Sequence, residues 1–200
     1  MSVEIVIASG NKGKLKEINK VIQPLGYSAV AQKDLDVPEP EETGLTFVEN
    51  ALIKARNAAK LTGRPALADD SGIEVDALKG QPGIYSARYA GVDASDKDNV
   101  KKLLEALIDV PESQRTARFQ CVIVYMRHAE DPTPIICQGS WEGSIALQAD
   151  GDNGFGYDPV FFVPSENCVA AKLTAERKNT LSHRGKALTQ LMQQLVNHSG

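Results

Sequence analysis

The order of apolar and polar residues along the chain alternates between strand-like and helix-like segments. Val3 to Ala8 is almost entirely apolar and rich in Val and Ile, which predicts a strand buried on both faces. After a glycine-containing segment, apolar residues spaced by three or four from Leu15 to Leu25 predict a helix that Gly26 ends. Ser28 to Ala31 is predicted to form a second strand. The N-terminal segment therefore reads as strand, glycine-bearing loop, helix and strand.

A second helix is predicted to begin at a capping box. Lys33 to Gly44 is acidic, contains two prolines and shows no periodicity, so it reads as a loop. Thr46 and Glu49 then have the capping-box spacing, and the helix should run to about Leu61. Its apolar face would be made by Phe47, Val48, Ala51, Leu52, Ala55, Ala58 and Ala59. Asn50 and Lys54 fall at the edge of this face, where a side chain can look into a cleft or simply be solvated.

The segment Ala66 to Gly72 combines a short apolar run with two adjacent carboxylates. The apolar residues predict a buried strand, and Gly72 predicts a turn just past its end. Ile73 to Leu78 would then pair back on that strand. Because neighbouring side chains on a strand point to opposite faces, Asp69 and Asp70 should have different surroundings. An ordinary turn, or a carboxylate that holds a cation or activates water, both fit these residues.

The second half of the chain adds a hairpin and further helices. A long loop from Lys79 to Gly91 is followed by a helix that starts with a capping box at Ser95 and ends before Pro111. Thr116 to Arg127 and Ile135 to Leu147 alternate as strands and should form an antiparallel hairpin with possible bulges at its glycines. Further elements are predicted as a loop over 150–158, a strand over 160–163, a helical turn from Thr174 and a last helix capped by Ser182. The predicted fold class is α/β, with a mixed sheet and helices on both sides, in two lobes around a cleft.

Composition and charge restrict the class of protein. The 200 residues carry a net charge of −4, which argues against broad non-specific binding of nucleic acid. The N-terminus shows no signal peptide, and no apolar run is long enough for a membrane helix. The cysteines, Cys121, Cys137 and Cys168, are widely spaced and form no metal-ligand pair, so we expect the first two to be buried thiols. We expect a cytoplasmic, reducing location.

Four stretches carry residues suited to chemistry. Ser9 to Lys14 joins a strand to a helix, and such a loop can present free N–H groups to a phosphate, although it is neither a Walker A motif nor GxGxxG. The acidic set of Asp69, Asp70 and the Glu41–Glu42 pair could hold magnesium on a phosphate substrate, with one carboxylate from the strand and one from the loop. Phe155, framed by glycines, could lie under a purine base, with Asp158 accepting from ring N–H groups. The ordinary alternatives are a tight turn, a solvated acidic loop and a core-anchoring aromatic.

The fourth stretch lies at the start of the last helix. His183 and Arg184 fall in its first turn, where the helix dipole disfavours cations, so a role in stabilising the helix explains them poorly. The donor fork of Arg184, aimed at a carbonyl, explains the position better.

Taken together, these stretches resemble one family, the inosine/xanthosine triphosphate pyrophosphatases, most closely in its bacterial form. The resemblance covers essentially the whole chain. The segments that carry it are SGNKGK at 9–14, ETG at 42–44, ADDSG at 68–72, PGIYSARY at 82–89, GFGYDP at 154–159 and SHR at 182–184, with Thr46-Phe47, Glu49-Asn50-Ala51 and Lys54-Ala55. The resemblance implies a two-lobed α/β fold with the site in a cleft, a homodimer and a magnesium requirement.

The resemblance also implies roles for single residues. Asp70 would be the proton acceptor and a magnesium ligand, and Glu42 the second metal ligand. Apart from the resemblance, we expect the neighbouring Asp69 to be a supporting group. The residues that would bind the triphosphate are Ser9, Gly10, Asn11, Lys12, Gly13, Lys14 and Ser71, with Lys54 and Lys178 nearby. Those that would form the base pocket are Phe155, Gly156, Tyr157, Asp158, His183 and Arg184. The implied reaction is hydrolysis of ITP, dITP or XTP to the monophosphate and pyrophosphate.

Other functions remain open on the sequence. One is a pyrophosphatase for modified pyrimidine nucleotides, and another is a protein that binds nucleotides without cleaving them. An acidic interaction module would leave the phosphate-type loop without a purpose. The expected partners are a small nucleotide substrate and a second copy of the chain, and neither nucleic acid nor a membrane.

Overall fold

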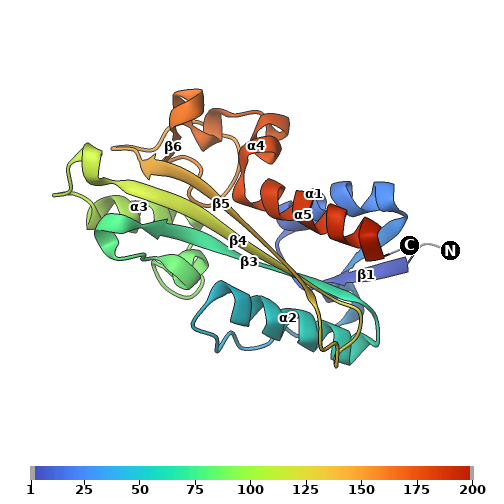
Figure 1. Cartoon of the computed structure of the whole chain (residues 1–200). Helices are drawn as coiled ribbons and strands as arrows, with labels where there is room; N and C mark the ends of the chain where they lie inside the picture. The colour runs from blue at the N-terminus through green and yellow to red at the C-terminus, as the bar shows by residue number, and fades with distance from the viewer. Residues whose placement is uncertain (1–2, 199–200) are drawn as a thin grey trace. The chain divides into compact units, whose positions relative to one another are not determined.

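The computed structural model describes residues 3–198 (Figure 1). The strands are β1 (Val3–Ile7), β2 (Tyr27–Ala31), β3 (Ala66–Val75), β4 (Thr116–Met126), β5 (Ile135–Ile145), β6 (Phe161–Val163) and β7 (Cys168–Val169). The α-helices are α1 (Lys12–Ile22), α2 (Phe47–Thr62), α3 (Asp96–Ala106), α4 (Ala175–Leu181) and α5 (His183–His198). The strands form one sheet in the order β2-β1-β3-β4-β5-β6-β7. Strand β1 pairs in parallel with both β2 and β3. Strand β6 pairs antiparallel with β5 on one side and with β7 on the other, so the predicted mixed sheet of an α/β fold is confirmed.

The chain divides into two compact units. The first contains the described residues of 1–70, 121–138 and 186–200, and the second contains 71–120 and 139–185. The chain passes from one unit to the other inside β3, β4 and β5 and in the first turn of α5, so continuous strands and a helix connect the units. A single domain of two lobes with a central cleft stays a prediction.

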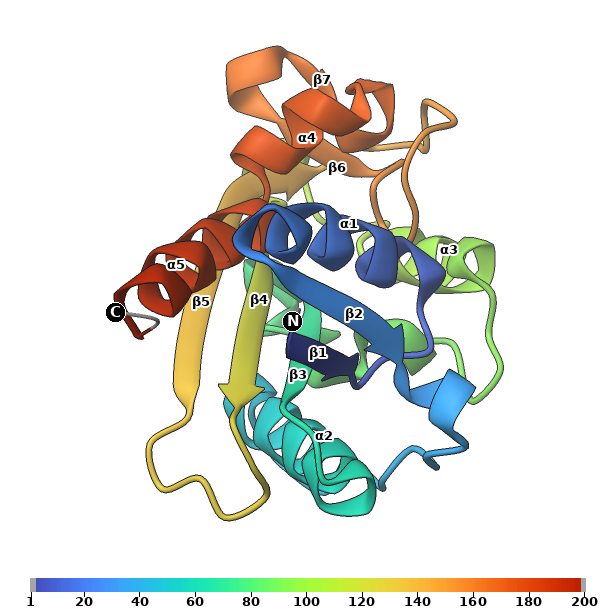
Figure 2. The same ribbon diagram turned by 90° about the vertical axis from the view of Figure 1, so that its right-hand side faces the viewer.

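In the first unit, the strands separate two apolar layers. Ile5 and Ile7 of β1 pack with Ile18 and Ile22 of α1 and with Leu188 of α5 on one face. The other face is covered by α2, whose predicted apolar residues all belong to the second layer together with Val6 (Figures 1 and 2). Of the run from Val3 to Ala8 predicted to be buried on both faces, residues 5–8 are buried, whereas Val3 at the start of the strand is 47% exposed.

Local signals set the helix boundaries of this unit. The Thr46 hydroxyl accepts from the Glu49 N–H, the Glu49 carboxylate accepts from the Thr46 hydroxyl, and Gly63 ends α2 in the left-handed conformation, so this helix is confirmed. The first helix starts earlier than predicted, at Lys12, because the Asn11 side chain caps it. Asn50 is fully buried rather than at an edge, and its Oδ1 accepts from the Gly44 N–H at 2.9 Å.

The turn predicted at Gly72 is wrong. Strand β3 continues without a break from Ala66 to Val75, so Ile73 to Val75 extend the same strand instead of pairing back on it. Asp70 consequently lies in mid-strand rather than at a strand tip. Turn propensity is overridden because Ile73 and Val75 are buried in the core of the second unit and the two carboxylates have lysine partners.

In the second unit, α3 packs on one face of the strands around Phe119, Trp141 and Phe161. Side-chain hydrogen bonds join Gln120 to Ser140 and Arg118 to Glu142, a spacing that fits the predicted antiparallel hairpin of β4 and β5. Residues 3–198 contain no helix with the length and apolar character needed to cross a membrane. Cys121 and Cys137 are buried, as predicted, and the three cysteines are free thiols.

The turn between β4 and β5 is held by one buried carboxylate, which gives a stability prediction. Asp131, whose side chain is 1% exposed, accepts from the Arg127 main-chain N–H at 3.0 Å, from the Arg127 guanidinium and from the Thr133 N–H at 3.0 Å. The Arg127 side chain holds the pKa of Asp131 well below its usual range.

We expect Asp131→Ala to lower the melting temperature at pH 7 by roughly 2–4 °C for each kcal/mol lost. Because the pKa of Asp131 is lowered in the folded protein, the contribution of this carboxylate to the free energy of unfolding is fully present above its unfolded pKa of about 3.9. That contribution is lost as the pH falls from this value toward the lower pKa of the folded state. Thermal scans should therefore show that the difference in melting temperature between Asp131→Ala and the wild type becomes smaller as the pH is lowered below about 5. A constant difference, or an equal loss in the exposed neighbour variant Glu130→Ala, would contradict this.

Candidate functional site

The side chains of several predicted site residues form two clusters, one in each unit. The lysine–carboxylate cluster of the first unit consists of Lys14, Glu42, Lys54, Asp69 and Asp70. The Phe155 cluster of the second unit consists of Ser71, Phe155, Asp158, Lys178 and Arg184. Lys178 and Ser71, expected beside the triphosphate, thus lie with base-pocket candidates. Asp70 and Ser71, one from each cluster, are consecutive residues.

The loop from Ser9 to Asn11 leads into the N-terminus of α1, as a phosphate-binding loop requires. Its geometry differs from the prediction of free N–H groups, because the N–H groups of Gly13 and Lys14 donate to Asn11 Oδ1 at 2.9 and 3.2 Å. Asn11 is itself held by its N–H, which donates to the Ser9 hydroxyl at 3.1 Å. An anion at this helix terminus would take over donors that Asn11 now occupies. The side chain of Lys12 lies outside the described part of the structure.

Three ion pairs, made by two lysines, organise the lysine–carboxylate cluster. Lys54 Nζ, from α2, lies 2.5 Å from Asp70 Oδ1 and 3.1 Å from Glu42 Oε1. Lys14 Nζ, from α1, lies 2.5 Å from Asp69 Oδ1. The neighbouring carboxylates of β3 therefore have different lysine partners, as the alternation of a strand predicts.

Burial changes the ionisation of this cluster. It raises the pKa of Asp70 above its ordinary value, although Lys54 opposes the change. Burial alone would lower the pKa of Lys54, but the Asp70 carboxylate and then Glu42 outweigh it, so the pKa of Lys54 is raised and the ammonium stays charged. A carboxylate with a raised pKa is a stronger base near neutral pH.

The same residues fit a divalent cation. Glu42 and Asp70 converge on one cationic group, the ammonium of Lys54, so their oxygens already share a positive charge. Magnesium is commonly held by one or two carboxylates, with waters and substrate phosphates completing its coordination. No group of three or more His, Cys, Asp or Glu side chains suited to a metal occurs among residues 3–198.

In the Phe155 cluster, two cations lie beside one aromatic ring. Lys178 Nζ is 4.6 Å and Arg184 Cζ 5.6 Å from the centre of the Phe155 ring. Arg184, only 3% exposed, donates to the Ser71 hydroxyl at 3.1 Å. Such a group offers a flat apolar surface together with hydrogen-bond donors, a combination suited to a heterocyclic base.

Asp158 fixes the loop that carries Phe155. Its Oδ2 forms an ion pair with Lys178 and accepts from the Phe155 N–H at 2.9 Å. Burial raises the pKa of Asp158, and Lys178 opposes the change. Gly154 adopts φ +82°, and a Cβ there would come within 2.0 Å of Asp158 Oδ2, so the loop requires a glycine at this position.

His183 and Tyr157 are built into the core beside this cluster. The His183 ring stacks on Phe119 at 4.8 Å and near Trp141 at 6.4 Å. The Tyr157 hydroxyl donates to the Ser86 carbonyl at 2.7 Å. Both side chains are buried, so they hold the backbone of the neighbouring residues in position. The sequence patterns did not predict the stacking partners of His183.

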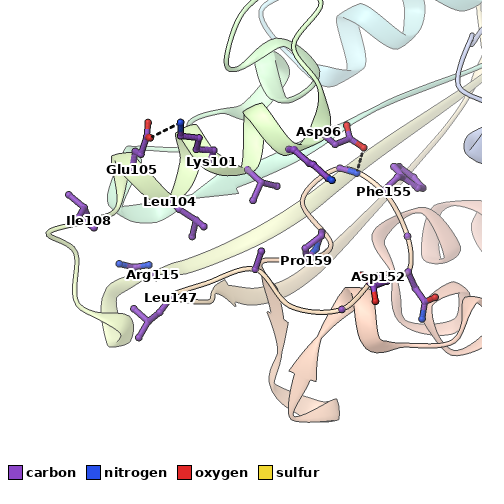
Figure 3. A pocket seen from close by; sticks show the side chains of 17 residues that line it. Asp96, Lys101, Leu104, Glu105, Ile108, Arg115, Leu147, Asp152, Phe155 and Pro159 are labelled. Carbon is purple, nitrogen blue, oxygen red and sulfur yellow. Dashed lines mark hydrogen bonds and ion pairs between the residues drawn. The ribbon is translucent and has the colours of Figure 1, made fainter.

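A pocket of about 700 Å³ lies between α3 and the loops around residues 147–159 (Figure 3). Its walls include Leu104, Leu147 and Phe155, while Asp96 Oδ2 accepts from the Gly156 N–H at 2.7 Å. Asp96, the first residue of α3, therefore holds the loop that carries Phe155 in position. No sequence motif indicated this contact, since the two residues are 60 positions apart.

Comparison with known structures first identifies the architecture. A HAM1 protein from Coxiella burnetii superposes with a TM-score of 0.92 at 52% identity, covering 98% of this chain and 99% of that one. The Ham1 protein of Staphylococcus aureus gives 0.87 at 42% identity, with the same coverage. The chain belongs to the Ham1 family, whose profile matches residues 5–194.

Curated relatives show a similar extent of likeness. A dITP/XTP pyrophosphatase of Vibrio vulnificus is 62% identical over 188 residues, which is 94% of each chain. A dITP/XTP pyrophosphatase of Shigella flexneri is 60% identical over 194 residues, covering 97% of this chain and 98% of the relative.

Proposed function

We propose that this protein is a nucleoside triphosphate pyrophosphatase that hydrolyses ITP, dITP and XTP to the monophosphate and pyrophosphate, and so removes non-standard purine nucleotides from the pool. The observation that carries the proposal is the Lys54 ammonium shared by Asp70 and Glu42. This is the arrangement of carboxylates and cation expected for a phosphate-transfer site, and the relatives named dITP/XTP pyrophosphatase match over nearly the whole chain.

Each cluster has the chemistry to bind one part of a nucleotide. The lysine–carboxylate cluster and the loop from Ser9 to Lys14 take the triphosphate, since these residues supply cations and helix N-terminal donors. The Phe155 cluster takes the base.

Hydrolysis between the α- and β-phosphates depends on charge placement. Asp70 orients the attacking water and accepts its proton, while Lys14 and Lys54 place positive charge near the leaving pyrophosphate. Asp70 and Glu42 would hold magnesium, which supplies further charge neutralisation when it is bound. Ser71 is no nucleophile in this scheme, because no His lies near it in the sequence to serve as its base, and its hydroxyl accepts from Arg184.

The base is selected by what Arg184 can donate. Hypoxanthine and xanthine carry a carbonyl at position 6, which accepts from a guanidinium, whereas adenine presents an amino group there. Arg184 has five donors and no acceptor, so an adenine would leave donor facing donor. Phe155 supplies the stacking surface.

The proposal includes a homodimer and a cytoplasmic location. The family resemblance implies the homodimer. The spacing of the cysteines, and a substrate that belongs to the nucleotide pool, favour the cytoplasmic location. Size-exclusion chromatography with light scattering should give twice the mass of 21.6 kDa.

A substrate panel with and without metal tests the proposed function. We expect pyrophosphate release from ITP, dITP and XTP to exceed that from GTP and ATP by at least tenfold, and chelation by EDTA to abolish it until magnesium is restored. Preference for modified pyrimidine nucleotides in the same panel would favour the related pyrimidine activity. Tight binding of ITP without release of pyrophosphate would favour a nucleotide-binding protein.

A further inference from the structure

Asp69 contacts both lysines of the lysine–carboxylate cluster. Its Oδ1 pairs with Lys14 Nζ at 2.5 Å, and its main-chain oxygen accepts from Lys54 Nζ at 3.1 Å. Its other side-chain oxygen, Oδ2, accepts from the Cys121 thiol at 3.2 Å. The Asp69 side chain is fully buried, while that of Lys14 is 16% exposed, so the carboxylate anchors the ammonium from the protein side.

These contacts fix the orientation of the carboxylate. One oxygen is held by the lysine of α1 and the other by the thiol of β4, so rotation about the Asp69 side chain would break both contacts. A lysine ammonium sits on a flexible four-carbon stem, so its position depends on its partner. Asp69 of β3 therefore determines where the Lys14 ammonium lies, and the hydrogen bond from Cys121 holds Asp69 in position.

We propose that Asp69 is a positioning residue that holds the Lys14 ammonium for the terminal phosphates of the substrate, and that Cys121 orients Asp69 for this task. The proposal rests on the proposed function, in which Lys14 contacts the triphosphate. Asp69 itself acts through Lys14 and does not touch the substrate. This separates the roles of the adjacent carboxylates, because Asp70 faces Lys54 and Glu42 instead.

A double-mutant cycle tests the coupling between Asp69 and Lys14. We expect Asp69→Asn to lower kcat/KM for ITP by about 10- to 100-fold, as is typical when the partner of a site residue is removed. In a Lys14→Gln background the same change should cost less than about threefold, because the group that Asp69 positions is gone. If the loss of kcat/KM in the double variant equals the product of the losses in the two single variants, the proposal is wrong.

Product inhibition localises the effect. The inhibition constant of pyrophosphate should rise in Asp69→Asn, while that of inosine monophosphate, read by the Phe155 cluster, should stay within about twofold of wild type. A general structural defect would weaken both products together, and that result would also overturn the proposal.

Cys121 gives a second route that does not depend on changing the carboxylate. Serine keeps a donor at this position, so Cys121→Ser should retain pyrophosphate affinity, whereas Cys121→Val should weaken it about three- to tenfold. Cys137→Val is the matched control, because Cys137 is equally buried in the same apolar cluster and makes no contact with Asp69 among the described interactions. Equal affinities in the serine and valine variants would remove Cys121 from the proposal.

The proposed function and this inference fail separately. Pyrophosphate release by the wild type, and its loss in Asp70→Asn, decide the function. If the wild type hydrolyses ITP and the cycle is multiplicative, only the positioning role is wrong. If the wild type does not hydrolyse ITP, the function is wrong, and the same cycle read from pyrophosphate binding still decides whether Asp69 and Lys14 act together.

Discussion

Asp70→Asn should fold like the wild type and release pyrophosphate from ITP about 10²- to 10⁴-fold more slowly, the range expected for loss of a general base. The amide keeps the shape of the carboxylate but cannot accept the proton of the attacking water, and it is a weak ligand for magnesium. The measurement is kcat from a coupled pyrophosphate assay at saturating magnesium, with the melting temperature recorded for each variant.

Asp76→Asn is the control for this change. Asp76 follows β3 directly, pairs with Arg118 and belongs to neither cluster, so its variant should keep wild-type turnover. Hydrolysis by Asp70→Asn at the wild-type rate would remove Asp70 from its assigned role. An equal loss in both variants would indicate a general effect of removing a carboxylate near this strand.

Arg184→Ala should reduce the preference for ITP over ATP. The ratio of kcat/KM for the two nucleotides should fall at least tenfold, because a charge-assisted hydrogen bond to the 6-carbonyl is lost and the donor that faces adenine is removed. The rate with ATP should change less than the rate with ITP. Steady-state kinetics on both substrates measure the ratio directly.

Arg177→Ala controls for loss of a guanidinium from the same unit. Arg177 lies on α4, pairs with Glu166 and has a side chain that is 52% exposed, so its removal should leave the ratio unchanged. An unchanged ratio in Arg184→Ala would exclude Arg184 from reading the base.

Local sequence signals predicted the elements whose ends are set by nearby residues. The capping box of Thr46 and Glu49 fixes the start of α2, and Gly63 fixes its end, within one stretch of chain. Apolar runs such as residues 5–7 likewise reported burial on both faces correctly.

Features that depend on distant partners could not be predicted in this way. The residues Asp69 to Gly72 favour a turn locally. However, Lys14 is 55 positions from Asp69 and Lys54 is 16 positions from Asp70, and these lysines stabilise the two carboxylates within a continuous strand. The hydrogen bond from Cys121 to Asp69 spans 52 positions, and the stack of Phe119 on His183 joins β4 to α5. Each contact arises from tertiary packing, which no local pattern encodes.

The two clusters show the same division. The sequence motifs and the family resemblance predicted which residues carry chemistry, while the structure shows how their side chains pair. Lys178 illustrates this, since the resemblance implies a place near the triphosphate and the structure shows its ion pair with Asp158 next to Phe155.

The most direct test of the central claim is the identity of the products formed from ITP by the wild-type protein with magnesium, followed by phosphorus NMR. Cleavage between the α- and β-phosphates predicts inosine monophosphate and pyrophosphate in equal amounts. Inosine diphosphate with orthophosphate, or intact ITP after prolonged incubation, would contradict the account.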